Sequence, residues 1–172
     1  MLNLLFRKCL LLALTCFTLS LPVAAQFPAH ENTVYYEGRP YLLHVTTDAE
    51  RKLWKSYGKD VNVLVMNDMG RNGYYLQKPI AELMGDFAGA VGIECVVAAG
   101  DIHHFYGVRS VNDPLWITNY DRVYSHPELM LPWYAVCGNH EYRGNTQAVV
   151  DYSTVSSRWR MPSRYYTKVI KE

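Results

Sequence analysis

The sequence predicts an α/β fold in which parallel strands form a sheet with helices packed against it. Three short apolar runs, 61–66, 95–99 and 133–137, are typical of buried core strands. Between them, the segments 75–90 and 112–123 carry apolar residues at helical spacing. Because strand and helix alternate along the chain, we expect right-handed crossovers and parallel neighbours, in the order strand, helix, strand, helix, strand.

Composition excludes several classes of protein. The chain has 172 residues, of which 49% are hydrophobic, so it is long enough for one domain or for part of a larger one. The formal net charge is only +1, which excludes a disordered tail and argues against a nucleic-acid partner.

The first 25 residues have the layout of a secretory signal peptide. Arg7 and Lys8 precede the apolar stretch 9–23, and small residues lead to a predicted cut near Ala25 and Gln26. We therefore expect a secreted or periplasmic protein without stable membrane insertion after cleavage. The alternative is an uncleaved anchor, which is less favoured because the apolar stretch is short for a membrane span.

Two cysteines remain after removal of the signal, Cys95 and Cys137, each at the end of a predicted core strand. An exported protein can pair them. A bridge between neighbouring core strands is geometrically awkward, so we favour two unpaired buried thiols and leave the pairing open.

Residues 26–60 are predicted to form an N-terminal lead-in with short strands and a helix. Two short strands at 34–36 and 41–45 flank a turn. Thr47 and Glu50 have capping-box spacing and predict the start of a short helix.

Each predicted core strand is followed by polar residues that can bind a metal ion. Asp68 follows the first strand, Asp101 and His104 follow the second, and Asn139 and His140 follow the third. The carboxyl ends of parallel strands meet at one edge of a sheet, where ligands commonly bind. A single such residue is usually a cap or turn former, but three aligned strand ends favour a metal site.

These motifs resemble the first three motifs of the calcineurin-like metallophosphoesterases: Asp68-Met69-Gly70, Gly100-Asp101 and Gly138-Asn139-His140-Glu141. Further segments are similar to the purple, tartrate-resistant type of acid phosphatase: Asn112-Asp113, 132–134, Gly144-Asn145, Tyr152-Ser153, Trp159, Met161-Pro162 and Tyr165-Tyr166. The resemblance implies a β-sandwich flanked by helices, of which residues 61–172 would be the N-terminal half. The family's Gly-His-x-His segment is missing after His140, so we expect an N-terminal fragment.

The resemblance also implies two metal ions, each Fe, Zn or Mn, and a role for each strand-end residue. Asp101 would bridge the ions, Asp68 would bind the first and Asn139 the second. His140 would act as proton donor or electrostatic clamp beside the phosphate, and Glu141 would hold His140 in orientation.

Two positions depart from the family pattern. Purple enzymes carry an iron-binding tyrosine three residues after the bridging aspartate, where this chain has His104. The wider superfamily has a histidine two residues after its first aspartate, where this chain has Gly70. We infer that His104 supplies the imidazole that Gly70 lacks, and we predict no purple colour. The alternative is that His104 points at substrate or solvent, as we expect for His103.

The implied activity is hydrolysis of phosphate monoesters, as in an acid phosphatase, by attack of a metal-bound hydroxide. The partner would be a small phosphorylated substrate, contacted from the loops by Arg71, Tyr142 and Arg143. Three alternatives stay open: a phosphodiesterase or nucleotidase of the same superfamily, an inactive truncated or binding protein that lacks the later histidine ligands, and a sugar- or peptide-binding module. We expect the fragment alone to be inactive; the ester and the oligomeric state stay open.

Overall fold

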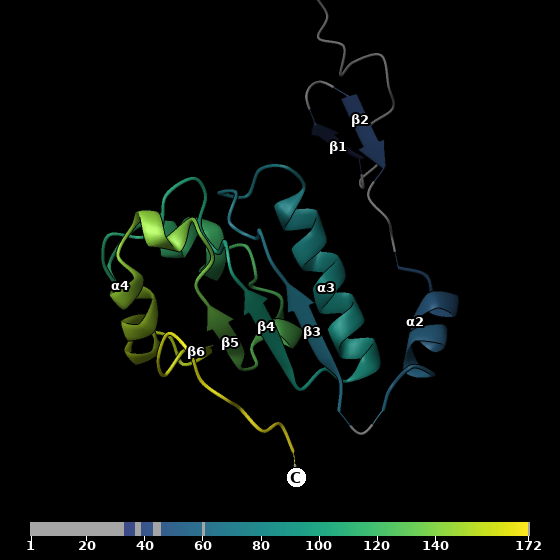
Figure 1. The fold of residues 1–172 in the computed structure, drawn as a ribbon. Coiled ribbons are helices and arrows are strands. Elements are labelled where there is room, and N and C mark those ends of the chain that lie inside the picture. The colour runs from purple at the N-terminus through teal and green to yellow at the C-terminus, as the bar shows by residue number, and fades with distance from the viewer. Residues whose placement is uncertain (1–32, 37–38, 43–45, 60, 172) are drawn as a thin grey trace, which may run out of the picture. The chain divides into compact units, whose positions relative to one another are not determined.

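The computed structural model divides the chain into two compact units, residues 1–43 and 44–172, which are considered separately (Figure 1). The described residues are 33–36, 39–42, 46–59 and 61–171. The predicted signal peptide and its predicted cleavage site therefore lie outside the described residues, as do positions 43–45 of the second predicted strand.

The first unit contains an antiparallel pair of strands, β1 (Thr33–Tyr36) and β2 (Arg39–Leu42). This confirms the two predicted strands. The second begins two residues earlier than expected and includes Pro40, which pairs with Tyr35. Proline is tolerated there because both strands of a two-stranded sheet are edge strands.

The second unit is built on a four-stranded sheet in the order β3-β4-β5-β6, with every neighbouring pair parallel. The strands are β3 (Val63–Met66), β4 (Cys95–Ala99), β5 (Trp133–Val136) and β6 (Trp159–Arg160). The three predicted core strands and their parallel arrangement are confirmed. The fourth was not expected, because two residues are too few to show a periodicity.

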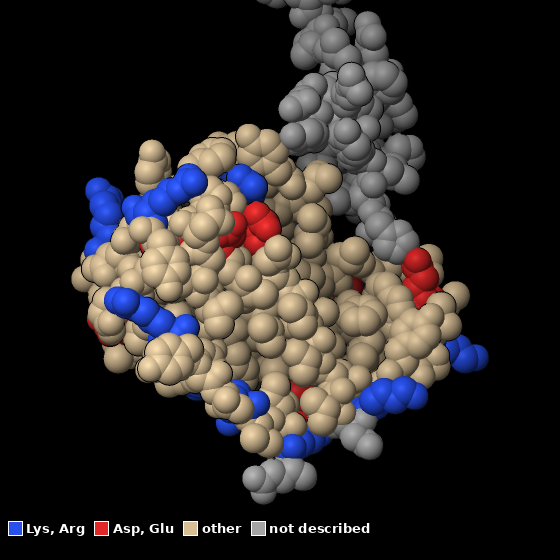
Figure 2. All heavy atoms as spheres, in the orientation of Figure 1, with Lys and Arg blue, Asp and Glu red and all other residues tan. Residues whose placement is uncertain are grey.

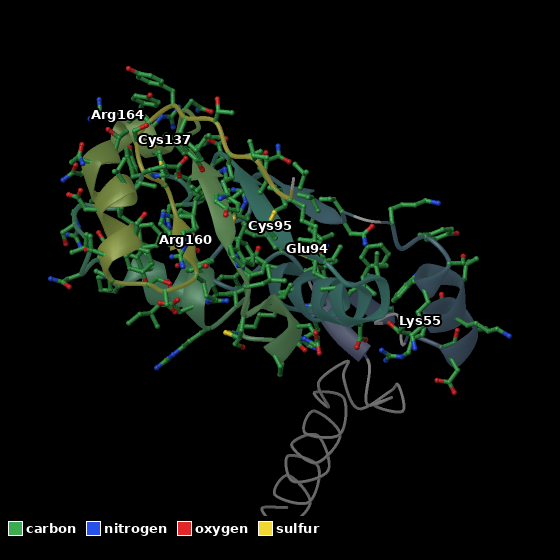
Figure 3. The ribbon with its side chains drawn as sticks, turned by 90° about the horizontal axis from the view of Figure 1, so that it is seen from below. Lys55, Glu94, Cys95, Cys137, Arg160 and Arg164 are labelled. Carbon is green, nitrogen blue, oxygen red and sulfur yellow. The ribbon has the colours of Figure 1, made fainter. Side chains whose placement is uncertain are left out.

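One face of this sheet is packed and the other is largely open. Val96 and Ala98 of β4 belong to the buried core beneath the helices. On the opposite face, the side chains of Val65 and Val136 are 68% and 39% exposed. The C-terminal segment runs beside this open face, where the Tyr166 hydroxyl donates to the Ala135 carbonyl at 2.9 Å (Figure 3).

The helix α2 (Asp48–Lys55) begins with the predicted capping box. The Glu50 amide donates to Thr47 Oγ1 at 3.2 Å, and the Thr47 amide donates to Glu50 Oε2 at 2.8 Å. These bonds satisfy amides that a helix start leaves without partners.

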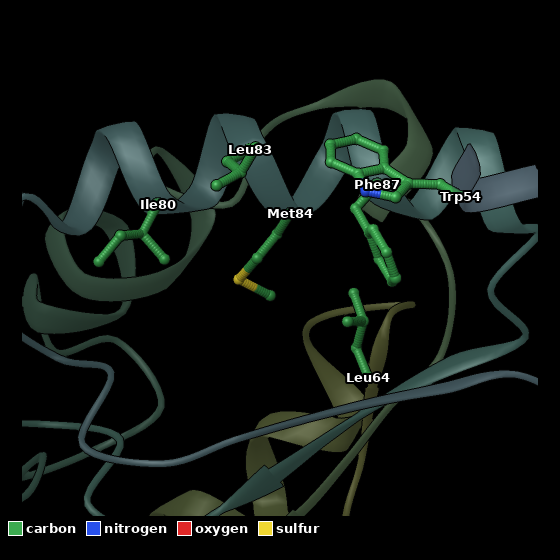
Figure 4. A pocket seen from close by; sticks show the side chains of 6 residues that line it. All are labelled: Trp54, Leu64, Ile80, Leu83, Met84 and Phe87. Atoms are coloured by element: carbon green, nitrogen blue, oxygen red, sulfur yellow. The ribbon is translucent and has the colours of Figure 1, made fainter. Parts of the chain in front are cut away.

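The long helix α3 (Gln77–Val91) confirms the segment predicted at 75–90. It contacts α2 through Trp54 and Phe87, whose rings meet edge to face at 5.2 Å. An open apolar groove of about 420 Å³ lies between these helices and β3 (Figure 4). No helix in the described ranges combines the length and the hydrophobicity that a bilayer span requires.

The helix predicted at 112–123 is shorter and more irregular than expected. Asp113 caps it as predicted, since Asp113 Oδ1 accepts from the Leu115 amide at 3.1 Å. One turn later it widens into the π-helix η2 (Ile117–Asp121), which buries Asn119. The remaining short helices are η3 (Pro127–Leu129), η4 (Glu141–Arg143), α4 (Thr146–Asp151) and η5 (Tyr152–Thr154).

Cys95 and Cys137, the cysteines within the described residues, are unpaired thiols, as we favoured. Cys95 is buried and Cys137 is half-buried (Figure 3). Burial, followed by the nearby Glu141 carboxylate, raises the pKa of Cys137 to about 11. Both groups are therefore protonated at neutral pH and act as small apolar side chains.

An aromatic cluster forms the centre of the core between the sheet and the short helices. Trp116 is 1% exposed and stacks face to face on Tyr152, with ring centroids 3.6 Å apart. Trp159 meets Trp116 edge to face at 5.3 Å. These rings pack the start of η2 against η5 and β6.

We expect Trp116→Ala to lower the free energy of unfolding by about 3–5 kcal/mol, because it removes a fully buried ring and leaves a cavity. Urea denaturation followed by circular dichroism measures the change. Trp54→Ala is the matched control: this ring borders the open groove, so its loss should cost less. Equal losses for the two variants would contradict the packing described here.

Candidate metal centre

Three loops at the carboxyl edge of the sheet carry the predicted site residues. The first follows β3 (67–73), the second follows β4 (100–107) and the third follows β5 (137–141). The Asp68 amide donates to the Gly100 carbonyl at 3.3 Å, which continues the ladder between the first two loops. Figure 2 shows exposed acidic atoms on the second unit with basic side chains close by.

The two aspartates at the strand ends have an unusual backbone conformation. Asp68 has φ 53° and Asp101 has φ 50°, both in the left-handed region. A non-glycine residue held there costs about 1–3 kcal/mol, and such residues cluster at functional sites. At both aspartates the backbone therefore leaves the extended conformation of the strands.

Four of the predicted residues come together. Asp101, His104 and His140 each offer one ligand atom, and these atoms all lie within 4.8 Å of one another. His104 Nε2 also lies 3.5 Å from Asp68 Oδ1, and His140 Nε2 lies 3.9 Å from Asp101 Oδ2. Asp101, His104 and His140 therefore form one cluster, with Asp68 beside His104. Carboxylates and imidazoles are suitable donors for a transition-metal ion.

The hydrogen bonds of the two imidazoles leave their Nε2 atoms free for a ligand. His104 Nδ1 lies 3.2 Å from the Gly70 carbonyl, and His140 Nδ1 lies 2.8 Å from the Phe105 carbonyl. A carbonyl can only accept, so both rings carry a proton on Nδ1, and each Nε2 atom faces a carboxylate. Burial and the nearby Arg71 lower the pKa of His104, which favours the neutral form that binds metal.

Gly70 lies so close to the second loop that no side chain fits there. A Cβ at Gly70 would overlap the Ile102 carbonyl oxygen and stand 2.7 Å from the Cα of His103. A histidine at this position is sterically excluded. The approach of His104 to Asp68 supports our inference that His104 supplies the imidazole instead.

Our expectation that His103 points at substrate or solvent is wrong. The His103 side chain is 0% exposed and stands perpendicular to Trp116, with ring centroids 4.6 Å apart. Burial lowers its pKa to about 3, so the ring is neutral. His103 follows Ile102 into the core, because the second loop folds inward before it returns to the surface at Phe105.

Glu141 is fully buried and joins the second and third loops. Its carboxylate accepts from the His103 amide at 3.0 Å and from the Gly138 amide at 2.8 Å. Burial raises its pKa, and these hydrogen bonds act in the opposite direction. The Glu141 carboxylate thus bonds the backbone of these loops, while the His140 ring is oriented by the Phe105 carbonyl.

The other predicted residues lie around this cluster. Asn139 is exposed beside His140, and Tyr142 and Arg143 are exposed on η4. Arg71 is half-buried, with its guanidinium 5.9 Å from the Tyr75 ring centre and 5.6 Å from the Phe105 ring centre. Arg71 is also close enough to His104 to lower the pKa of that imidazole.

A parallel sheet with carboxylates and imidazoles at its carboxyl edge defines an α/β protein with a candidate metal site. No protein-family model matches the chain. Among curated proteins, purple acid phosphatase 3 of Arabidopsis thaliana is 33% identical over 158 residues, which cover 87% of this chain and 43% of that protein. Tartrate-resistant acid phosphatase type 5 of Oryctolagus cuniculus is 37% identical over 87 residues, covering 50% of this chain and 27% of that protein. The chain belongs to the calcineurin-like phosphoesterases and is similar to their purple acid phosphatase branch.

A solved structure supports the same fold. The protein described as GAP50, the anchor in the inner membrane complex of Plasmodium, superposes with a TM-score of 0.56 at 24% identity. The match covers 62% of this chain and 35% of that one. The chain spans less than half the length of the curated relatives it matches.

We expect the three histidines of the second and third loops to show two different tautomers. His104 and His140 should carry the proton on Nδ1, because each bonds a carbonyl through that atom. His103 should carry it on Nε2, because its Nδ1 faces the Asn119 amide nitrogen at 3.2 Å. Two-bond ¹H–¹⁵N spectra of the imidazoles distinguish the tautomers. A single tautomer shared by all three rings would rule out this arrangement.

We expect Gly70→Ala to weaken metal binding and stability, because the added methyl group collides with the backbone of the second loop. The expected cost is about 1–3 kcal/mol of unfolding free energy. Gly89→Ala is the control. Gly89 lies inside α3, and a Cβ there would meet the flexible side chain of Glu128, at 3.0 Å. Chemical denaturation should show the control as neutral or stabilised. A harmless Gly70→Ala would contradict the close approach.

Proposed function

We propose that the protein is an exported two-metal phosphoesterase that hydrolyses phosphate monoesters, like an acid phosphatase. The observation that carries this proposal is the convergence of Asp68, Asp101, His104 and His140 at one sheet edge. The similarity to curated acid phosphatases supports the reaction class. Export rests on the signal peptide expected at residues 1–25. The expected partner is a small phosphorylated substrate.

The geometry suggests how the ligands are shared. Asp68 and His104, 3.5 Å apart, would hold the first ion. Asp101 would bridge to a second ion held by Asn139. The donor set of carboxylate, imidazole and amide suits Fe, Zn or Mn. When bound, such ions neutralise phosphate charge and lower the pKa of a coordinated water.

The chain's own residues would bind and orient the ester. Arg71 is held by two aromatic rings at the mouth of the site and would pair with a phosphate oxygen. Tyr142 and Arg143 are exposed on η4, where they would contact the rest of the substrate. His140 Nε2 has no proton in the neutral ring, so His140 would donate one to the leaving group only as an imidazolium.

We propose further that residues 61–172 form the N-terminal half of the phosphoesterase domain, and that this 172-residue chain is inactive by itself. Among the residues that the structure describes, the second ion has only Asp101 and Asn139 as proposed ligands, fewer than a catalytic site normally provides. A phosphodiesterase or nucleotidase would use the same ligands, and a panel of phosphomonoesters and phosphodiesters, tested with a complete phosphoesterase domain, would separate these activities.

We expect Asp101→Asn and His104→Ala each to lower the affinity for Zn²⁺ or Mn²⁺ at least about tenfold, because each removes a direct ligand. Equilibrium dialysis with metal analysis measures this. Asp151→Asn, on the exposed face of α4, is the matched control and should bind as the unaltered chain does. Iron-loaded protein should lack a purple absorption band, since His104 replaces the tyrosine. Such a band, or full metal affinity in Asp101→Asn, would overturn the assignment.

A further inference from the structure

Two buried side-chain amides next to the candidate metal site have no role in the proposed chemistry. Gln77, at the start of α3, is 5% exposed, and Asn119, in the π-helix η2, is 0% exposed. A buried amide is stable only when its donors and acceptors find partners. The partners of these two residues lie in the loops that carry the candidate ligands.

The Gln77 side chain uses all of its hydrogen-bonding capacity, mostly within the first loop. Its Oε1 accepts from the Arg71 amide at 3.1 Å and from the Gly73 amide at 2.7 Å. Its Nε2 donates to the carbonyls of Met69 and Asn119, the latter at 3.0 Å. The Gln77 side chain therefore bonds three backbone groups, at Met69, Arg71 and Gly73, in the loop that presents Asp68.

Asn119 continues the connection from the first loop to the second. Its Oδ1 accepts from the Asn72 amide at 2.5 Å, so its Nδ2 is the atom that faces His103 Nδ1 at 3.2 Å. Because Nδ2 can only donate, His103 accepts through Nδ1. At the exposed rim, Thr118 Oγ1 donates to Asn72 Oδ1 at 2.6 Å.

The same chain of contacts reaches the third loop. The His103 amide donates to Glu141, and Glu141 also accepts from the Gly138 amide. Gln77, Asn119, His103 and Glu141 thus form one buried network, which we call the amide relay. It connects the loops bearing Asp68, His104 and His140.

The loops need such support because their backbones are strained. Asp68, Asn72 and Asp101 all have positive φ, at 53°, 52° and 50°. Strained residues of this kind persist only where the surrounding contacts over-determine them. Removing one member of a buried network leaves the others without partners, which costs more than the single bond is worth.

We propose that Gln77 and Asn119 are positioning residues, and that the amide relay holds the three ligand-bearing loops at metal-binding distance. The metal part of this statement rests on the proposed function. The relay itself is a property of the fold and can be tested without any metal.

The first test needs no substitution. Because the relay joins the loops, the amides of Asn72, His103 and Gly138 should exchange with deuterium through one shared opening, with protection factors that agree within about tenfold. Independent opening of the three loops, seen as widely different protection, would overturn the proposal.

The second test compares Gln77→Met with Gln147→Met. Both substitutions keep the length of the side chain and remove one amide, but Gln147 is exposed on α4, where its Nε2 donates to Asp151 at 2.8 Å. In Gln77→Met, the amides of Arg71 and Gly73 should exchange at least about tenfold faster. Co²⁺ affinity, measured by dialysis, should fall about 10- to 100-fold. The control should match the unaltered chain in both measurements.

A third variant covers the case in which Gln77→Met does not fold. Thr118→Val removes the exposed bond to Asn72 and keeps the core intact, and it should speed exchange at Asn72 and weaken Co²⁺ binding by a smaller factor. Folded variants whose amide exchange and Co²⁺ affinity match those of the unaltered chain would contradict the proposal. If the unaltered chain binds no Co²⁺ but its loops open together, the proposed function fails and the relay stands.

Discussion

The close approach of Gly70 to the backbone of the second loop is the constraint on which the candidate site depends. Because Gly70 has no side chain, the Ile102 carbonyl can occupy the space that a Cβ atom would fill. The second loop then turns inward, buries His103 and returns with His104 facing Asp68. The Gly70 carbonyl completes the arrangement by accepting from the His104 ring. The first loop has no room for a histidine at Gly70, and the second loop provides the imidazole of His104 beside Asp68 instead.

The parallel sheet and the shared edge of the candidate ligands were predictable from the sequence because they follow from short, regular patterns. Apolar runs located β3, β4 and β5, and the polar residues after each run had to meet at one edge. The capping box at Thr47 is equally local and was correct. In each case the information lies within a few neighbouring residues.

The features that sequence reasoning missed depend on contacts between distant residues. His103 and His104 are neighbours with the same side chain, yet one is packed against Trp116 and the other faces Asp68. Gln77 and Asn119 are 42 residues apart and carry no signal that separates them from exposed amides. The π-helix that aims Asn119 inward is also invisible to a helical periodicity. Only the packed structure reveals these roles.

The positive φ angles of Asp68 and Asp101 link the stability of the protein to the supply of metal. Each residue stores about 1–3 kcal/mol of conformational strain. A cation that binds the folded chain alone would offset this strain, with a stabilisation of about 2.7 kcal/mol at a concentration one hundred times its Kd. The melting temperature of the chain should therefore rise with the free metal concentration.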